Sequence, residues 1–272
     1  MRIEFAQVLS IAGKEFHDHI RNRWLLAMVA VFTAFALAIA YFGAAQQGIV
    51  GLRSVEVTIA SLVSLVIYLV PLIALMSGYD TIVGERERGS LALLLSMPIT
   101  RFELLLGKYL GLAATLVSST VIGFGVVGVL LGYKFGAGAI LHYGGFMASA
   151  VALGMAFLSI SMLISVTASS RVSASGMAIV AWFGFVLVYD LLLLALLVAV
   201  QGKLNASVVP VLLMLNPADA FRMLNIFGFA DVARLYGLAA VVPKPLATPL
   251  VQGAAMVLWI VFPLGIASWR FK

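Results

Sequence analysis

This chain contains a series of long apolar stretches with hardly a charge inside them. A helix that crosses a bilayer needs about 20 mostly apolar residues. Six stretches meet or approach that length, at residues 24–43, 57–77, 109–131, 145–168, 174–200 and 250–268. Because their apolar residues run continuously and do not alternate with polar ones, a transmembrane β-barrel is excluded. The sequence therefore predicts an all-α polytopic membrane protein with six transmembrane helices.

The composition excludes a soluble globular domain of this length. Only 10% of the 272 residues are charged and 63% are hydrophobic, whereas a soluble domain carries about 25% charged residues to keep its surface wet. The chain has no cysteine, which excludes disulfides, thiolate metal sites and cysteine nucleophiles. The formal net charge of +6 is distributed by topology and is not gathered into one patch, so we expect no nucleic-acid partner.

The basic residues predict the orientation. With six spans both termini lie on one side, together with the connection between the second and third spans. That side carries Arg2, Lys14, Arg21, Arg23, Arg86, Arg88, Arg101, Lys108, Arg171, Arg270 and Lys272. The other side carries Arg53, Lys134, Lys203, Arg222, Arg234 and Lys244. Because basic residues accumulate on the cytoplasmic side, we expect both termini in the cytoplasm.

The first 23 residues have the pattern of an amphipathic helix. Its two faces carry Val8, Ala12, Phe16 and Ile20 on the apolar side, and Glu4, Gln7, Lys14, Asp18 and Arg21 on the polar side. Such a helix lies in the membrane interface and would turn into the first span at Trp24. A plain anchor helix is the alternative reading.

The connection at residues 78–108 combines charge with a short apolar run. Glu85, Arg86, Glu87 and Arg88 alternate in sign, and glycines stand on both sides of them. Ser90 is placed to cap a short helix over residues 91–95, which Pro98 would end. From the residues alone, this segment is either a docking surface or a solvated loop whose charges prevent insertion.

The outer segment at residues 201–249 predicts short extracytoplasmic helices before the last span. Residues 204–215 are apolar, but they are too short to span the bilayer and contain Pro210, so we expect a re-entrant or extracytoplasmic piece. Asn216, Pro217 and Asp219 form a helix start, with the helix ending near Gly228. A second helix is expected over residues 230–241. A lid, a partner surface and a structural cap all fit this pattern.

A search for catalytic and metal-binding motifs gives none. The chain has neither a GxxxxGK[ST] nucleotide loop nor an HExxH zinc motif, and His17, His19 and His142 are scattered. Its eleven methionines form no cluster with copper-ligand spacing, which favours packing. We therefore expect no catalytic residue, no metal site and no bound cofactor on this chain.

Asp190 is the one acidic residue deep inside a predicted span. An ionisable group at that depth costs about 2.5–3.5 kcal/mol on insertion scales and usually faces a cavity or a partner. The sequence suggests no basic residue near it in the bilayer interior. A polar point on a translocation path, a hydrogen-bonded anchor between helices and a helix break are all open readings.

The connection at residues 78–108 resembles the cytoplasmic coupling segment of ABC-2 type transporter permeases. The resemblance rests on Asp80 and Ile82, on residues 85–91 (Glu-Arg-Glu-Arg-Gly-Ser-Leu), on residues 94–101 (Leu-Leu-Ser-Met-Pro-Ile-Thr-Arg) and on residues 107–111 (Gly-Lys-Tyr-Leu-Gly). Family members commonly have Thr at the position of Ser90. The resemblance implies one transmembrane domain over residues 1–272 in the bacterial inner membrane. It also implies a homodimer, and a separate cytoplasmic ATPase subunit that binds the ATP and Mg.

This resemblance assigns roles to residues. The predicted coupling residues are Glu85, Arg86, Glu87, Arg88, Gly89, Leu91, Leu94 and Arg101. We expect Arg86, Arg88 and Arg101 to pair with acidic residues of the ATPase, and Leu91, Leu93 and Leu94 to fill its groove. The N-terminal helix would contribute Lys14, Glu15, Phe16, Arg21 and Arg23.

A narrower resemblance, to the copper-processing members of that family, rests on residues 14–16 and 21–24 and on residues 216–222. It implies a role in copper-site assembly of nitrous oxide reductase and a periplasmic β-helix partner, which Asp219, Phe221 and Arg222 would contact. The cargo would be a copper-related or sulfur-containing species. An exporter of unrelated cargo and an ATPase-independent carrier or scaffold are the alternatives.

Overall fold

The computed structural model describes residues 4–43, 51–52, 54–200, 208–226 and 248–271. These residues form helices and no strand, which confirms the predicted all-α fold. Six helical runs in this part of the chain are long and apolar enough to span a membrane. They are α2 (Trp24–Phe42), α3 (Val55–Gly78), α6 (Arg101–Phe135), α7 (Ala137–Thr167), the run of α8 (Arg171–Phe183), η2 (Gly184–Val188) and α9 (Tyr189–Ala199), and α13 (Pro249–Arg270).

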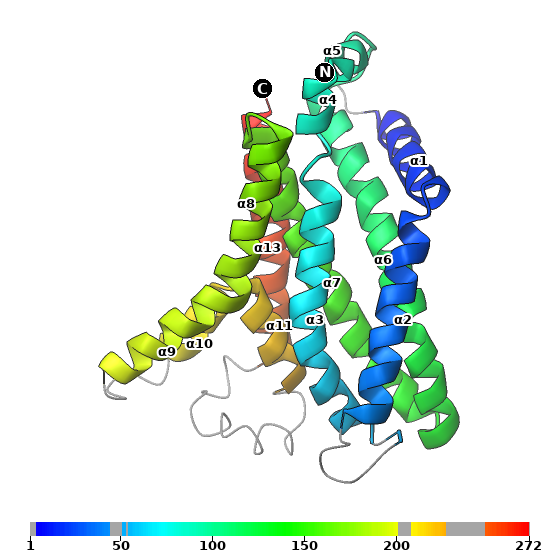
Figure 1. Cartoon of the computed structure of the whole chain (residues 1–272), viewed down its shortest axis with the longest axis vertical. Coiled ribbons are helices and arrows are strands. Elements are labelled where there is room, and N and C mark those ends of the chain that lie inside the picture. Colours follow the sequence, from blue (N-terminus) through cyan, green and yellow to red (C-terminus); the bar gives the residue numbers. More distant parts are fainter. Residues whose placement is uncertain (1–3, 44–50, 53, 201–207, 227–247, 272) are drawn as a thin grey trace.

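The bundle is organised around α7. This helix packs against α3, α6 and α13, while α6 carries α2 on another side (Figure 1). Aromatic rings fill the space between α2, α6 and α7: the ring of Phe124 lies 5.3 Å from that of Phe32 and 5.9 Å from that of Phe146, centroid to centroid. Such contacts between aromatic rings stabilise the helix packing by more than the burial of their apolar surface alone.

The fifth span departs from the bundle. Its middle, η2, is a π-helical turn, after which α9 leans away from the other spans (Figure 1). Single π-turns inside α-helices occur often at functional sites. This turn ends two residues before Asp190, but the helical run continues through Asp190 to Ala199, so the fifth span has an irregular turn near Asp190 and no helix break there.

Five short helices complete the described chain. They are α1 (Phe5–Arg21), α4 (Val83–Glu87), α5 (Ser90–Leu95), α10 (Val208–Met214) and α11 (Pro217–Ile226). The start of α11 is as predicted, because Asn216 Oδ1 accepts a hydrogen bond from the Ala218 N–H at 3.0 Å. The helix predicted over residues 230–241 lies outside the described residues.

Three predicted helix starts were wrong. The fourth span begins at Ala137 and not at Gly145. The third span begins at Arg101 and not at Tyr109, because Thr100 and Glu103 form a capping box that starts the helix earlier. Ser90 is the first residue of α5 and not its cap. The cap position belongs to Gly89, whose φ of 74° suits glycine, and the Ser90 hydroxyl donates to the Glu85 carbonyl.

The cytoplasmic side predicted from the basic residues is one end of the bundle. The start of α1, the helices α4 and α5, and the end of α13 all lie there (Figure 1). We call it the α5 end and the opposite one the α11 end.

Candidate functional site

The first helix is packed directly on the α5 end of α6. Gly107 and Gly111 make this possible: a Cβ on Gly107 would lie 2.7 Å from the Ile11 Cβ, and one on Gly111 would lie 2.6 Å from the Glu15 Cβ. Two small residues one turn apart are a common way for helices to approach closely. The contact face runs through Val8, Ile11, Ala12 and Glu15, so it includes part of the predicted apolar face, whereas Ile20 of that face remains exposed.

Filling the Gly111 position should therefore detach α1. We expect Gly111→Leu to raise the labelling rate of a Val8→Cys thiol about tenfold, since overpacking costs about 1–3 kcal/mol. Val8 is buried and the chain has no other cysteine, so the label reports α1 alone. Gly125→Leu on the same helix is the control, because a Cβ there meets nothing within 4 Å. Equal labelling in the two variants would contradict this packing.

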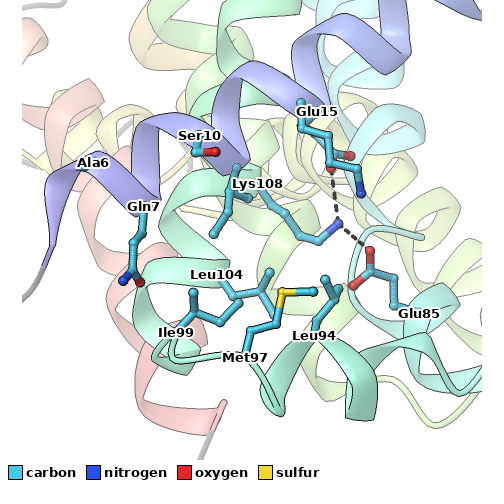
Figure 2. A pocket seen from close by; sticks show the side chains of 12 residues that line it. Ala6, Gln7, Ser10, Glu15, Glu85, Leu94, Met97, Ile99, Leu104 and Lys108 are labelled. Atoms are coloured by element: carbon cyan, nitrogen blue, oxygen red, sulfur yellow. Dashed lines mark hydrogen bonds and ion pairs between the residues drawn. The ribbon is translucent and has the colours of Figure 1, made fainter.

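Lys108 joins three elements at one buried ammonium. Its Nζ lies 3.2 Å from Glu15 Oε2 of α1 and 2.7 Å from Glu85 Oε1 of α4, and its side chain is only 6% exposed (Figure 2). A buried ion pair gains little net stability, because desolvation offsets the attraction. It does require a defined geometry. The cluster of Lys108, Glu15 and Glu85, which we call the Lys108 cluster, therefore holds α1, α4 and α6 in register.

Glu103 fastens the beginning of α1 to the beginning of α6. Its carboxylate accepts hydrogen bonds from the Glu4 N–H at 2.7 Å, the Thr100 N–H at 2.6 Å and the Thr100 hydroxyl at 2.7 Å. Sequence reasoning missed both Glu103 and Lys108 as site residues. The Thr100–Glu103 spacing, which is that of a capping box, was the signal for Glu103.

Residues 82–86, which precede α5, are hydrogen-bonded to the end of α7. Arg86 donates to the carbonyls of Ala168 at 3.1 Å and Val166 at 3.2 Å, and the Ser165 hydroxyl accepts from the N–H groups of Ile82 and Val83. The last carbonyls of a helix have no hydrogen-bond donor within that helix. The Arg86 guanidinium supplies donors to two of them. Arg86, which we expected to pair with an acidic residue of the ATPase, is thus engaged within this chain.

Two further charges of the segment are engaged with α8. Arg171 holds both carboxylate oxygens of Asp80 through Nε and Nη2, and its backbone N–H donates to Glu87 Oε1 at 2.8 Å. With Glu85 bound to Lys108, the alternating cluster at residues 85–88 serves mainly internal contacts. Arg86, Glu87 and Arg88 are all exposed, whereas Glu85 is half-buried.

The outward-facing part of this end is the tip of α5. Leu93 is 70% exposed and Met97 56%, whereas Leu91 and Leu94 are half-buried against the bundle. Beside the tip, a groove of about 580 Å³ separates α1 from α5 (Figure 2). Its walls include Gln7, Ser10, Lys14, Glu85, Leu94, Met97, Ile99 and Lys108. We call the tip, Arg88 and this groove the coupling surface.

The remaining predicted residues of the N-terminal helix lie around its end. Lys14 is exposed on the groove and Phe16 is half-buried. Arg21 pairs with Asp18 at 3.2 Å in an exposed contact, and Arg23, with φ 58°, forms the turn into α2. Arg101 lies away from the groove, with its guanidinium carbon 5.9 Å from the centroid of the Phe271 ring.

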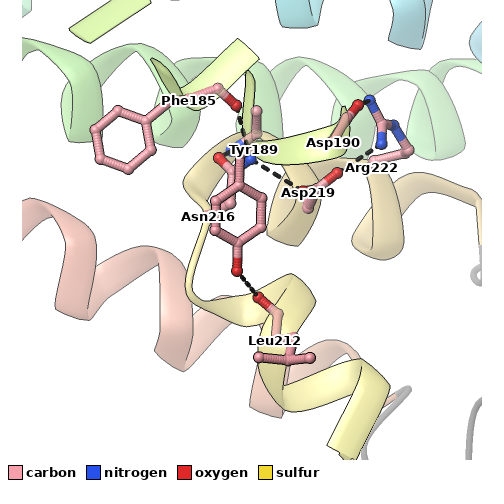
Figure 3. Close-up of polar contacts among 8 residues, drawn as sticks. Phe185, Tyr189, Asp190, Leu212, Asn216, Asp219 and Arg222 are labelled. Atoms are coloured by element: carbon pink, nitrogen blue, oxygen red, sulfur yellow. Dashed lines mark hydrogen bonds and ion pairs between the residues drawn. The ribbon is translucent and has the colours of Figure 1, made fainter. Parts of the chain in front are cut away.

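At the α11 end, Asp190 has a basic partner, so the expectation of none was wrong. Arg222 Nη2 lies 2.9 Å from Asp190 Oδ2, and Arg222 Nη1 lies 2.6 Å from Asp219 Oδ1 (Figure 3). The pairing could not be found in the sequence, because Arg222 was placed in the outer segment. We call Asp190, Arg222 and Asp219 the outer charge cluster.

Uncharged contacts tie the fifth span to the same short helices. Asn216 Nδ2 donates to the carbonyl of Phe185 inside the π-turn at 2.7 Å, and the Tyr189 hydroxyl donates to the carbonyl of Leu212 in α10 at 2.5 Å (Figure 3). A π-turn displaces backbone hydrogen bonds, and Asn216 supplies a donor there. From the sixth span, Trp259 Nε1 donates to the Met214 carbonyl at 3.1 Å.

The residues expected to meet a periplasmic partner lie mostly inside the protein. Asp219 and Phe221 are fully buried, and the Arg222 guanidinium forms ion pairs with Asp190 and Asp219. Burial raises the pKa of Asp219 from its ordinary 3.8 to about 7, against the lowering effect of Arg222. In the described part of the chain, no group of three or more His, Cys, Asp or Glu side chains is placed to hold a metal ion.

Comparison with known proteins gives consistent matches. A family described as "ABC-2 family transporter protein" matches residues 9–272. A protein of Pseudomonas aeruginosa named "Probable ABC transporter permease protein NosY" is 45% identical over 274 residues, which cover 97% of this chain and 98% of that protein. A protein of the same name from Stutzerimonas stutzeri is 44% identical over 278 residues, 98% of each chain.

Proposed function

Because the chain belongs to the ABC-2 family of transporter proteins and is a NosY-like permease subunit of an ABC transporter, we propose that a separate cytoplasmic ATPase drives it through the coupling surface. The ATPase binds the nucleotide and Mg, and this chain contributes no catalytic residue. The α5 end then faces the cytoplasm of the bacterial inner membrane, with both termini on that side.

The Lys108 cluster is the observation that carries this proposal. Any force applied to α4 and α5 reaches α6 through Glu85 and Lys108, and reaches α1 through Glu15. Because α6 is a single helix from Arg101 to Phe135, the same motion continues across the membrane. The hydrogen bonds from α4 to the end of α7 and to the start of α8 give a second route, which leads into the fifth span.

A second copy of the chain completes the proposed transporter. The run from α8 to α9 exposes large apolar side chains, among them Val172, Val180 and Leu191. Lipid or a partner helix must cover such a face. We place the second copy here, because the fifth span leans away from its own bundle (Figure 1).

The finer role we propose follows the relatives' name. As a NosY-type permease, this chain would serve the maturation of nitrous oxide reductase, and its cargo would be a copper-related or sulfur-containing species. A periplasmic β-helix protein would meet the outer helices. Since Asp219 and Phe221 are buried, its contacts would fall on other residues of that end.

The coupling surface makes a direct prediction for Leu93. We expect Leu93→Asp to weaken ATPase binding about thirtyfold or more, because buried apolar anchors dominate protein interfaces. Membrane insertion and thermal stability should stay unchanged, since this side chain is exposed in the permease. The measurement is the amount of ATPase subunit that co-purifies from mild detergent.

Tyr133→Asp is the matched control. Tyr133 is 95% exposed at the far end of α6, where a cytoplasmic protein does not reach. Undiminished ATPase binding by Leu93→Asp would place the docking site elsewhere. A wild-type permease that binds no ATPase at all would favour a carrier or scaffold.

A further inference from the structure

Two hollows lie where α6 begins and α13 ends, and α4 and α5 supply most of the lining of the first one. The first, of about 390 Å³, is at the α5 end, and three arginines line it together with apolar side chains: Arg86, Arg101, Arg270, Leu91, Leu95 and Phe271. Among the described residues no acidic side chain lines it. Three arginines around apolar side chains make this pocket cationic, which favours an anionic group.

The second hollow lies along α6 and α13, further from the α5 end. It is an apolar groove of about 210 Å³ between the same two helices, lined by Phe102, Leu105, Ile260, Val261, Leu264 and Gly265, among others. Phe102 directly follows Arg101 in α6, and Ser268 stands two residues before Arg270 in α13, so the groove starts within one helical turn of two arginines of the pocket. Phe102 is 42% exposed and Val261 59%, which shows that the groove opens to the outside of the bundle.

The depth of the pocket matches a membrane surface. Trp269 is 59% exposed, and the Arg270 guanidinium carbon lies 5.3 Å from the centroid of its ring. Exposed tryptophans next to basic residues mark the headgroup level of a bilayer. A cationic pocket at that level, with an apolar groove below it, has the shape and polarity of one phospholipid.

We propose that α6 and α13 bind an anionic phospholipid of the cytoplasmic leaflet. Its phosphate lies among Arg86, Arg101 and Arg270, and an acyl chain lies in the groove. Arg86 already donates to two backbone carbonyls, so it contributes mainly charge. Arg101 and Arg270 lie over aromatic rings, an arrangement that keeps the N–H edge of a guanidinium free for phosphate.

An acidic side chain of the ATPase could also satisfy the arginines, but it would leave the apolar groove empty. Basic pockets between transmembrane helices on the cytoplasmic side are a recognised form of lipid-headgroup site. The apolar groove beside the cationic pocket therefore favours the lipid.

The test titrates phosphatidylglycerol and phosphatidylcholine onto the delipidated full-length protein and measures the bound lipid by native mass spectrometry. We expect a preference for phosphatidylglycerol that falls roughly thirtyfold in the double variant Arg101→Gln/Arg270→Gln. The control, Lys14→Gln/Arg21→Gln, removes two positive charges from the same end outside the pocket and should keep the preference. Equal loss in both double variants would show a diffuse charge effect and overturn the site.

A second variant tests the groove separately. A side chain at Gly265 meets nothing within 4 Å, so Gly265→Leu fills the groove without strain and should weaken phosphatidylglycerol binding about tenfold. Gly253→Leu is the control, because its site on the same helix is equally open. Unchanged binding by Gly265→Leu, or equally strong binding of glycerol phosphate, would reduce the site to a plain anion pocket. Reduced ATPase binding with lipid binding intact would make it a protein contact.

Discussion

Replacing Lys108 by alanine should destabilise the α5 end and uncouple the transporter. The change leaves the carboxylates of Glu15 and Glu85 mostly buried, close together and without their shared cation. Breaking a buried ion pair from one side costs about 3–5 kcal/mol. We expect a lower unfolding temperature of the detergent-solubilised protein and the loss of substrate-linked ATPase activity in the reconstituted complex.

A triple variant separates folding from coupling. In Lys108→Met/Glu15→Gln/Glu85→Gln no charge is left unpaired, so the cost of an uncompensated buried charge is removed. We expect the unfolding temperature to recover while ATPase coupling stays low, because α4 is no longer held to α1 and α6 by charge. Recovery of both would make the Lys108 cluster a structural anchor, and transmission through it would be wrong.

The membrane fold could be predicted because it depends on properties that are local in the sequence. An uninterrupted apolar run of sufficient length has no other stable environment than lipid, so the six spans followed from counting. The start of α11 was predictable for the same reason, since an Asn-Pro pair acts on its own backbone. The start of α6 was missed although its capping box is equally local.

The internal pairing could not be predicted, because it depends on which helix faces meet. Lys108 reaches Glu15 and Glu85 only because Gly107 and Gly111 bring α1 against α6. For this reason, charged residues of the connection at residues 78–108 were predicted to contact a partner protein. In the structure Glu85, Arg86 and Glu87 are engaged by residues far away in the sequence.

In the outer charge cluster, Arg222 is the shared cation of Asp190 and Asp219. We expect Arg222→Met to lower the unfolding temperature strongly, because it leaves Asp219 buried beside Asp190 without a cation, again at a cost of about 3–5 kcal/mol. The α10–α11 pair would lose its ionic link to the fifth span. The measurement is thermal unfolding of the full-length protein in detergent at pH 5 and pH 8.

The pH dependence identifies the group responsible. Burial places the folded-state pKa of Asp219 above its ordinary value even with Arg222 present, and removing the guanidinium raises it further. Stability that depends on a raised carboxyl pKa is full at low pH and is lost as the pH rises through that pKa. Arg222→Met should therefore be clearly more stable at pH 5 than at pH 8.

Adding Asp219→Asn to Arg222→Met removes the buried carboxylate and should restore stability at pH 8 while abolishing most of the pH dependence. An equal loss of stability at both pH values would show that lost packing, and not charge, is the cause. If the double variant also restores transport, Asp190 and its partners act as an anchor between the fifth span and α11. If stability returns and transport does not, the cluster lies on the path of the cargo.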